Sequence, residues 1–117
     1  MINFAQGTKV FLSCQPVDMR KGMDGLSAQV KTVIRMDPFS GHLFVFRGKR
    51  AGYVKILHWD GSGLCLYAKR MEKGAFVWPP ILDEQLLLTS AQLALLIEGI
   101  DWRRTVAAPE TQRPSVV

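Results

Sequence analysis

The sequence predicts an α+β domain: an antiparallel β-meander of about five to six strands, with one long amphipathic helix and one short C-terminal helix. Short apolar runs separated by glycine-rich turns fill the middle of the chain, which is typical of a meander. Apolar residues at helical spacing precede these runs. A chain of 117 residues is long enough for one core. We therefore expect a single domain over residues 1–104 and a disordered tail over 105–117.

The N-terminal part predicts a strand followed by the long helix. Residues 8–13 (TKVFLS) are rich in β-branched and aromatic residues. Asp18 then occupies an N-cap position. Spacings of three and four residues place one set of side chains on the buried face of the helix: Met19, Met23, Leu26, Val30 and Val33. The solvent face carries Arg20, Asp24, Ser27, Lys31 and Arg35. We expect the helix to end near Arg35, because Asp37 precedes a proline.

The next four strands are expected over residues 43–47, 53–59, 64–70 and 75–78. Asp60–Gly61 between apolar runs is a strong hairpin signal. The other loops are equally short, and short loops join antiparallel neighbours. Pro79–Pro80 should stop the fourth of these strands.

A short strand over 85–88 and a helix after Thr89 complete the expected fold. Thr89 and Gln92 have the spacing of a capping box. The helix buries Leu93, Leu96 and Ile97, and Gly99 suits the position just after its end.

Positive charge gathers between residues 42 and 78. The chain has 15 Lys and Arg against 10 Asp and Glu, a net charge of +5. Net positive charge favours encounter with polyanions such as DNA. We expect the basic residues at strand ends and turns to form a phosphate-contacting rim: Arg47, Lys49, Arg50, Lys55, Lys69, Arg70 and Lys73. Arg20 and Lys21 are further candidates, and Lys31 and Arg35 either extend this surface or form a solvated helix face.

Aromatic residues interleave with these cations, which raises two alternatives. They could stack on nucleic-acid bases, or they could be buried in the core or in a protein interface. The two longest predicted strands are largely apolar on both faces, and this favours burial. An apolar sheet face that docks another protein or a second copy of the chain, without DNA binding, is therefore an alternative function.

Catalytic, metal and cofactor motifs are not found. His42 and His58 are sixteen residues apart, and no cluster has zinc-ligand spacing. Cys14 and Cys65 are expected to be reduced and buried. We predict no catalytic residue, no metal and no cofactor, with a small metal-dependent nuclease using Asp18, Asp24 or Asp60 as a third alternative. Neither a signal peptide nor a membrane span is recognised, so we expect a cytoplasmic protein.

Five segments resemble one known family. They are residues 16–26 (PVDMRKGMDGL), 37–46 (DPFSGHLFVF), 55–63 (KILHWDGSG), 69–74 (KRMEKG) and 95–102 (LLIEGIDW). Over residues 8–104 the chain resembles the TnpB accessory proteins, encoded by the second open reading frame of the insertion-sequence-66 transposon family. The resemblance implies a bacterial mobile-element protein that works beside a separate transposase, and it carries over no catalytic residue.

The leading hypothesis is therefore a non-catalytic accessory protein that assists transposition. We expect it to bind DNA (the transposon ends), the transposase of the same element, or both, through a basic-rimmed sheet. Self-association is a further candidate interaction, and no membrane is expected as a partner.

Overall fold

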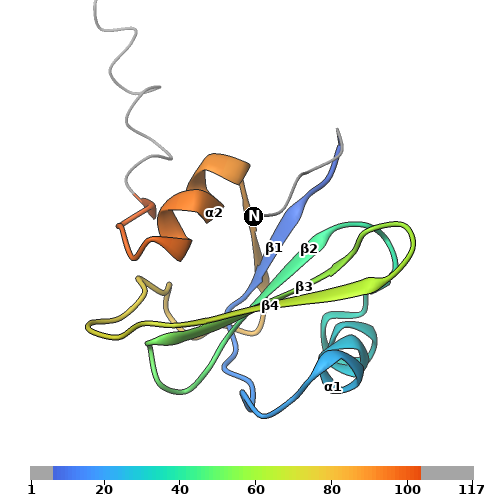
Figure 1. The fold of residues 1–117 in the computed structure, drawn as a ribbon, viewed down its shortest axis with the longest axis horizontal. Helices are drawn as coiled ribbons and strands as arrows, with labels where there is room; N and C mark the ends of the chain where they lie inside the picture. Colours follow the sequence, from blue (N-terminus) through green and yellow to red (C-terminus); the bar gives the residue numbers. More distant parts are fainter. Residues whose placement is uncertain (1–6, 104–117) are drawn as a thin grey trace, which may run out of the picture.

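The computed structural model describes residues 7–103 and confirms an α+β fold (Figure 1). Its elements are β1 (Val10–Ser13), α1 (Met23–Gln29), η1 (Val30–Ile34), β2 (Leu43–Arg47), β3 (Tyr53–Trp59), β4 (Leu64–Arg70), β5 (Gln85–Leu88) and α2 (Ser90–Ile97). The predicted tail over 105–117 lies outside the described residues.

The sheet is mixed, so the expectation of a purely antiparallel meander was wrong. Its strand order is β4-β3-β2-β1-β5. The antiparallel hairpins β2–β3 and β3–β4 are present as expected. β1, however, pairs parallel to β2, with Val10 opposite Leu43, and antiparallel to β5. The long connection through α1 returns the chain to the end of the sheet at which it began, which is what a parallel pair requires.

Residues 75–78 do not form the predicted fourth strand of the meander. This segment instead lies against the β2–β3 loop and makes hydrogen bonds to it. The backbone N–H of Phe76 and the indole Nε1–H of Trp78 both donate to the carbonyl of Ala51, each at 3.0 Å. Phe76 is only 3% exposed. The apolar character of the segment therefore reflects core packing, and the chain continues to the opposite edge of the sheet to form β5.

The first helix is shorter than expected, because it begins at Met23 and not at Asp18. The Asp18 carboxylate accepts a hydrogen bond from the Arg20 backbone N–H at 2.9 Å and closes a turn. Gly22, with extended backbone, is the residue before the helix. The predicted end is confirmed: Arg35 has a φ of 62°, and Met36 N–H donates back to the Val30 carbonyl.

A π-helical turn, η1, changes which side chains of this helix face the sheet. A π-turn accommodates an extra residue, so the buried face rotates after Gln29. Ile34 is buried at 8% exposure, whereas the predicted core residue Val33 is 54% exposed. Two residues before the π-turn also differ from the expectation: Met23 is 42% exposed, and Ser27, expected on the solvent face, is buried.

The two helices cover opposite faces of the sheet (Figure 1). Phe44, Phe46 and Leu57 pack with α1 and η1 on one face. The other face packs against α2, and its core includes Val10, Leu12, Leu43, Val45, Val54, Ile56, Leu93 and Leu96. The Thr89–Gln92 capping box is present, with both hydrogen bonds formed, at 2.8 and 3.0 Å. Gly99 follows the helix with a φ of 77°, as expected.

Candidate functional site

A basic hollow lies where the β2–β3 loop meets the segment before α1. Its volume is about 390 Å³. Three exposed cations line it: Arg20, Lys49 and Arg50. Tyr53 contributes an aromatic ring and Asp18 a carboxylate. The fold thus brings Arg20, from the turn before the helix, to the tip of the β2–β3 loop.

Two backbone features build this hollow. Val17 N–H donates to the carbonyl of Arg47 at 2.9 Å, which fixes the segment before α1 against the end of β2. Gly48 then allows Met19 to pack closely, since a Cβ at this position would lie 2.6 Å from Met19 Cγ. Gly48 lies in the loop between β2 and β3, and no local sequence pattern indicates its contact with Met19.

An ion pair at the rim of the hollow reduces its net charge. Arg20 Nη2 lies 2.8 Å from Asp18 Oδ2. Hydrogen bonds from the Arg20 side chain and backbone hold the pKa of the Asp18 carboxyl well below its usual range. Both side chains remain exposed, so solvent weakens this pair and Arg20 stays accessible to another anion.

Two of the predicted cations make contacts that join the sheet to segments outside it, the loop before α1 and the end of α2. Lys55 is only 8% exposed, and its Nζ donates to the carbonyl of Lys21 at 2.9 Å. Lys69 Nζ donates to the carbonyl of Ile97, also at 2.9 Å. Ile97 ends α2, where the helix dipole favours a cation. These ammonium groups therefore have structural partners within the domain.

The remaining predicted cations differ in exposure. Arg47 is half-buried, with its guanidinium 5.4 Å from the Trp78 ring centroid. Lys21 is also half-buried, whereas Arg70 and Lys73 are exposed. Met71 N–H donates to the Gly52 carbonyl at 2.8 Å, so the chain after β4 lies beside the β2–β3 loop. We use the term basic end for the exposed cations that this arrangement gathers: Arg20, Lys49, Arg50, Arg70 and Lys73.

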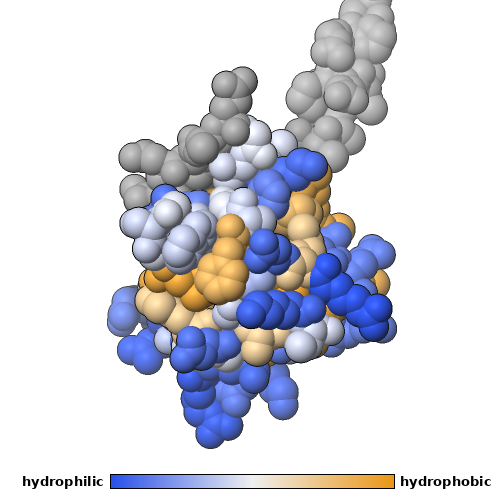
Figure 2. All heavy atoms as spheres, turned by 90° about the vertical axis from the view of Figure 1, so that its right-hand side faces the viewer, coloured by the Kyte–Doolittle hydropathy of each residue, from blue (hydrophilic) through white to orange (hydrophobic). Residues whose placement is uncertain are grey.

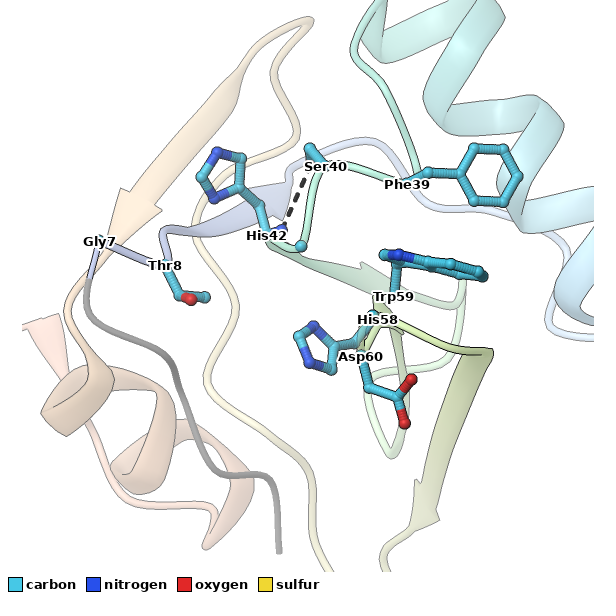
Figure 3. A pocket seen from close by; sticks show the side chains of 10 residues that line it. Gly7, Thr8, Phe39, Ser40, His42, His58, Trp59 and Asp60 are labelled. Atoms are coloured by element: carbon cyan, nitrogen blue, oxygen red, sulfur yellow. Dashed lines mark hydrogen bonds between the residues drawn. The ribbon is translucent and has the colours of Figure 1, made fainter.

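A second hollow, of about 530 Å³, lies at the opposite end of β3 (Figure 3). His42 and His58 both line it, but their rings point in different directions. His42 Nδ1 accepts the Lys9 backbone N–H at 3.0 Å, and its ring meets the ring of Phe11 edge-on. His58 is buried, and its Nδ1 has no hydrogen-bond partner among residues 7–103. The fold does not bring the two imidazoles together as a catalytic or ligand pair.

Asp60 has the turn role that the sequence predicts. Its Oδ1 accepts the backbone N–H groups of Ser62 and Gly63 at 2.9 and 2.8 Å. These hydrogen bonds lower the pKa of Asp60 to about 2. Asp18 and Asp60 line different hollows, one at each end of β3. Within residues 7–103, no group of three or more His, Cys, Asp or Glu side chains could hold a metal ion.

Both cysteines are free thiols, and only one of them is buried as expected. Cys14 is buried, and this burial raises the pKa of its thiol. Cys65 lies on edge strand β4, and its thiol side is exposed, so the expectation of burial was wrong for Cys65.

The aromatic side chains of residues 42–78 are either buried or half-buried in the domain. Phe44 and Phe46 are fully buried, and the half-buried residues are Tyr53, Trp59, Tyr67 and Trp78. Some apolar side chains nevertheless remain exposed, among them Val33 and Phe39 at 54% and 46%. Figure 2 shows a face on which hydrophobic surface lies between hydrophilic margins. Of the helices within residues 7–103, none is long and apolar enough to cross a membrane.

One family model matches the chain, and two relatives align with it over its whole length. Residues 8–107 match the family described as IS66 Orf2-like protein, TnpB_IS66. Two relatives are uncharacterized proteins of Sinorhizobium fredii (strain NBRC 101917 / NGR234), y4jC and y4hO. They are 40% and 38% identical over 117 residues, which is 100% of this chain and 99% of each relative. No solved structure matches the chain.

This family comprises accessory proteins of insertion sequences and is not a known enzyme family, which agrees with the predicted absence of catalysis. The match covers nearly all of the described domain, including both hollows and the basic end. The chain belongs to the IS66 Orf2-like family of insertion-sequence proteins.

Proposed function

We propose that this protein assists transposition as a non-catalytic factor that binds DNA through its basic end. The observation that supports this most directly is the convergence of five exposed cations from three separate segments. Arg20 precedes α1, Lys49 and Arg50 lie in the β2–β3 loop, and Arg70 and Lys73 lie at and after the end of β4. Clustered Lys and Arg side chains attract the phosphate backbone of DNA.

The chemistry of the basic end favours phosphates over base edges. Its cations lie on turns and strand ends, and within residues 7–103 none of them lies on a helix that could serve as a recognition helix. Phosphate contacts position a protein on DNA without reading its sequence. Arg20 can exchange its exposed partner Asp18 for a phosphate, because the ion pair with Asp18 is solvated. In this proposal the protein has the transposase of the same element as a partner, and the transposase recognises the sequence of the transposon ends.

A salt-titrated DNA-binding measurement tests this proposal. Fluorescence anisotropy with the element's terminal repeats and with unrelated DNA should give similar affinities. We expect both affinities to fall steeply as salt increases, since binding releases counterions from the DNA. Binding that is insensitive to salt, or no binding to either DNA, would contradict the proposal.

Charge-reversal variants test whether the basic end is the surface that binds DNA. Lys49→Glu with Arg50→Glu should weaken binding by at least about tenfold on both DNAs and reduce the salt dependence. The matched control is Lys9→Glu with Lys31→Glu, which changes the same total charge at exposed positions away from the basic end. Lys31 lies 5.5 Å from the Phe39 ring, beside the second hollow. Equal losses in the two double variants would show that net charge, and not the basic end, controls binding.

The alternative function is a protein-docking module without DNA binding. Exposed Val33 and Phe39 favour it, because they lie on or next to the helix that covers one sheet face. DNA affinity separates the alternatives, because a docking module without DNA binding would co-purify with the transposase and show no affinity for DNA. Val33→Asp with Phe39→Asp should abolish such co-purification while leaving DNA affinity unchanged, whereas the variant at Lys49 and Arg50 should do the reverse.

A further inference from the structure

β4 is an edge strand that has one hydrogen-bonded neighbour. It pairs with β3 over seven consecutive residues, Leu64–Arg70, and no other strand within residues 7–103 pairs with it. Edge strands in natural proteins are commonly protected by proline, by a bulge or by a short length. Leu64–Arg70 contains no proline, its register with β3 is uninterrupted, and its only charges are at one end, Lys69 and Arg70.

The hairpin fixes which backbone groups of β4 point outward. Asp60 N–H donates to the Gly63 carbonyl at one end, and Met71 N–H donates to the Gly52 carbonyl at the other. Hydrogen-bonded and non-hydrogen-bonded pairs alternate along an antiparallel ladder. Residues 65, 67 and 69 therefore bond to β3. The outward N–H and C=O groups belong to Leu64, Leu66, Ala68 and Arg70.

We propose that β4 is a self-association site, at which it pairs antiparallel with β4 of a second copy about a twofold axis through Tyr67. In this register Leu66 lies opposite Ala68 of the second copy, and Leu64 lies opposite Arg70 of the second copy. Both strands overlap over their whole length, and all four outward-facing residues of each copy find partners. The two sheets join into one continuous sheet.

Charge favours a second copy as the occupant. The cations Lys69 and Arg70 end the strand, while Asp60 precedes the turn at its beginning. Antiparallel pairing brings Arg70 of each copy toward the Asp60 turn of the other. Like charges stay apart: Lys69 lies four residues, or about 14 Å, along the ladder from Lys69 of the second copy, beyond a Debye length of about 8 Å.

Side chains at the axis are also compatible with self-pairing. Tyr67 would face Tyr67 of the second copy in a non-hydrogen-bonded pair, where cross-strand side chains approach most closely. Tyr67 packs partly against the α2-side core, so its ring is held near the edge of the sheet. Cys65 is exposed and would lie opposite Lys69 of the second copy.

The first test is the mass of the protein in solution. Sedimentation equilibrium over a dilution series should give twice the chain mass at high concentration. Ala68→Pro removes an outward N–H without removing a bond to β3, and Ala68 is exposed. We expect this variant to be monomeric with an unchanged circular dichroism spectrum. Ala68→Val retains the N–H and should remain dimeric. A wild-type protein that is monomeric throughout, or a folded Ala68→Pro variant that still dimerises, would overturn the proposal.

A cross-linking test determines the register and does not need the proline variant to fold. In a Cys65→Ser background, Tyr67→Cys places two thiols across the axis, at the Cα separation of about 4.5 Å that a disulfide can bridge. Ala68→Cys in the same background separates the thiols by two residues along the ladder and serves as the matched control. Oxidation should convert the Tyr67→Cys variant to a disulfide-linked dimer and the Ala68→Cys variant to much less of this dimer. Equal cross-linking, or none at residue 67, would overturn the register. Neither test depends on DNA binding.

Discussion

The ammonium group of Lys69 lies 2.9 Å from the carbonyl oxygen of Ile97, twenty-eight residues later in the chain. This contact joins edge strand β4 to the last turn of α2. The terminal carbonyls of a helix lack intrahelical partners, and the negative end of the helix dipole adds to the attraction for a cation. A residue expected in a phosphate-contacting rim thus also holds the second helix on the sheet.

Replacing Lys69 should therefore affect stability more than its surface position suggests. We expect Lys69→Met to lower the free energy of unfolding by about 1–2 kcal/mol, since a charge-assisted hydrogen bond is lost while the apolar stem is largely kept. Lys73→Met, at an exposed turn position, should change it by less than about 0.5 kcal/mol. Urea denaturation of both variants checks this, and equal effects would contradict a structural role for Lys69.

Gly48 should be intolerant of a side chain because Met19 occupies the adjacent space. A Cβ on Gly48 would lie 2.6 Å from Met19 Cγ, so Met19 must move. We expect Gly48→Ala to cost about 1 kcal/mol of stability and to weaken DNA binding by altering the basic hollow. Met19→Ala should remove most of the additional cost of Gly48→Ala. A double-mutant cycle of Gly48→Ala and Met19→Ala measures this coupling. Additive changes in stability and DNA affinity would show that packing between residues 19 and 48 does not determine the shape of the basic hollow.

Local signals predicted much of this fold. The capping box at Thr89 and Gln92 formed because both partners lie within one helical turn. β3 and β4 have the expected bounds, since Asp60 and the glycines around it determine the turn between them. These features depend on residues close in sequence, and their chemistry can be read without knowledge of the remaining fold.

Features that depend on distant contacts were not predicted. Nothing in Val10–Ser13 indicates that β1 pairs parallel to β2, because this pairing depends on how α1 packs. The π-turn moved Val33 outward and Ile34 inward, although the apolar spacing favoured Val33. At the candidate site, the contact of Lys55 with the Lys21 carbonyl spans thirty-four residues. Sequence spacing could not distinguish this buried lysine from exposed Lys49.

Acid should destabilise the protein in part through Asp60. Backbone N–H groups of Ser62 and Gly63 lower the pKa of Asp60 to about 2, below the value of about 3.9 expected in the unfolded chain. The stabilisation is therefore present above about pH 4 and is lost as the pH falls toward 2. An NMR titration of the Asp60 carboxyl should give a midpoint near 2. In Asp60→Asn the free energy of unfolding should depend less on pH between about 4 and 2. A titration midpoint near 4 for the Asp60 carboxyl of the wild-type protein would contradict the turn hydrogen bonds.

His58 should be replaceable by an apolar residue, whereas His42 should not. His58 is buried and no group of the described residues 7–103 hydrogen-bonds its Nδ1, so the fold of these residues removes a polar atom from water without compensation. We expect His58→Leu to leave the free energy of unfolding unchanged or to raise it by up to about 1 kcal/mol. His42→Leu is the matched control. It removes the acceptor of the Lys9 N–H and the edge contact with Phe11, and should cost about 1–2 kcal/mol. Thermal denaturation compares the two variants. A large loss of stability in His58→Leu would show that the imidazole has a partner in solution, and a loss of DNA binding without unfolding would assign it to the binding surface.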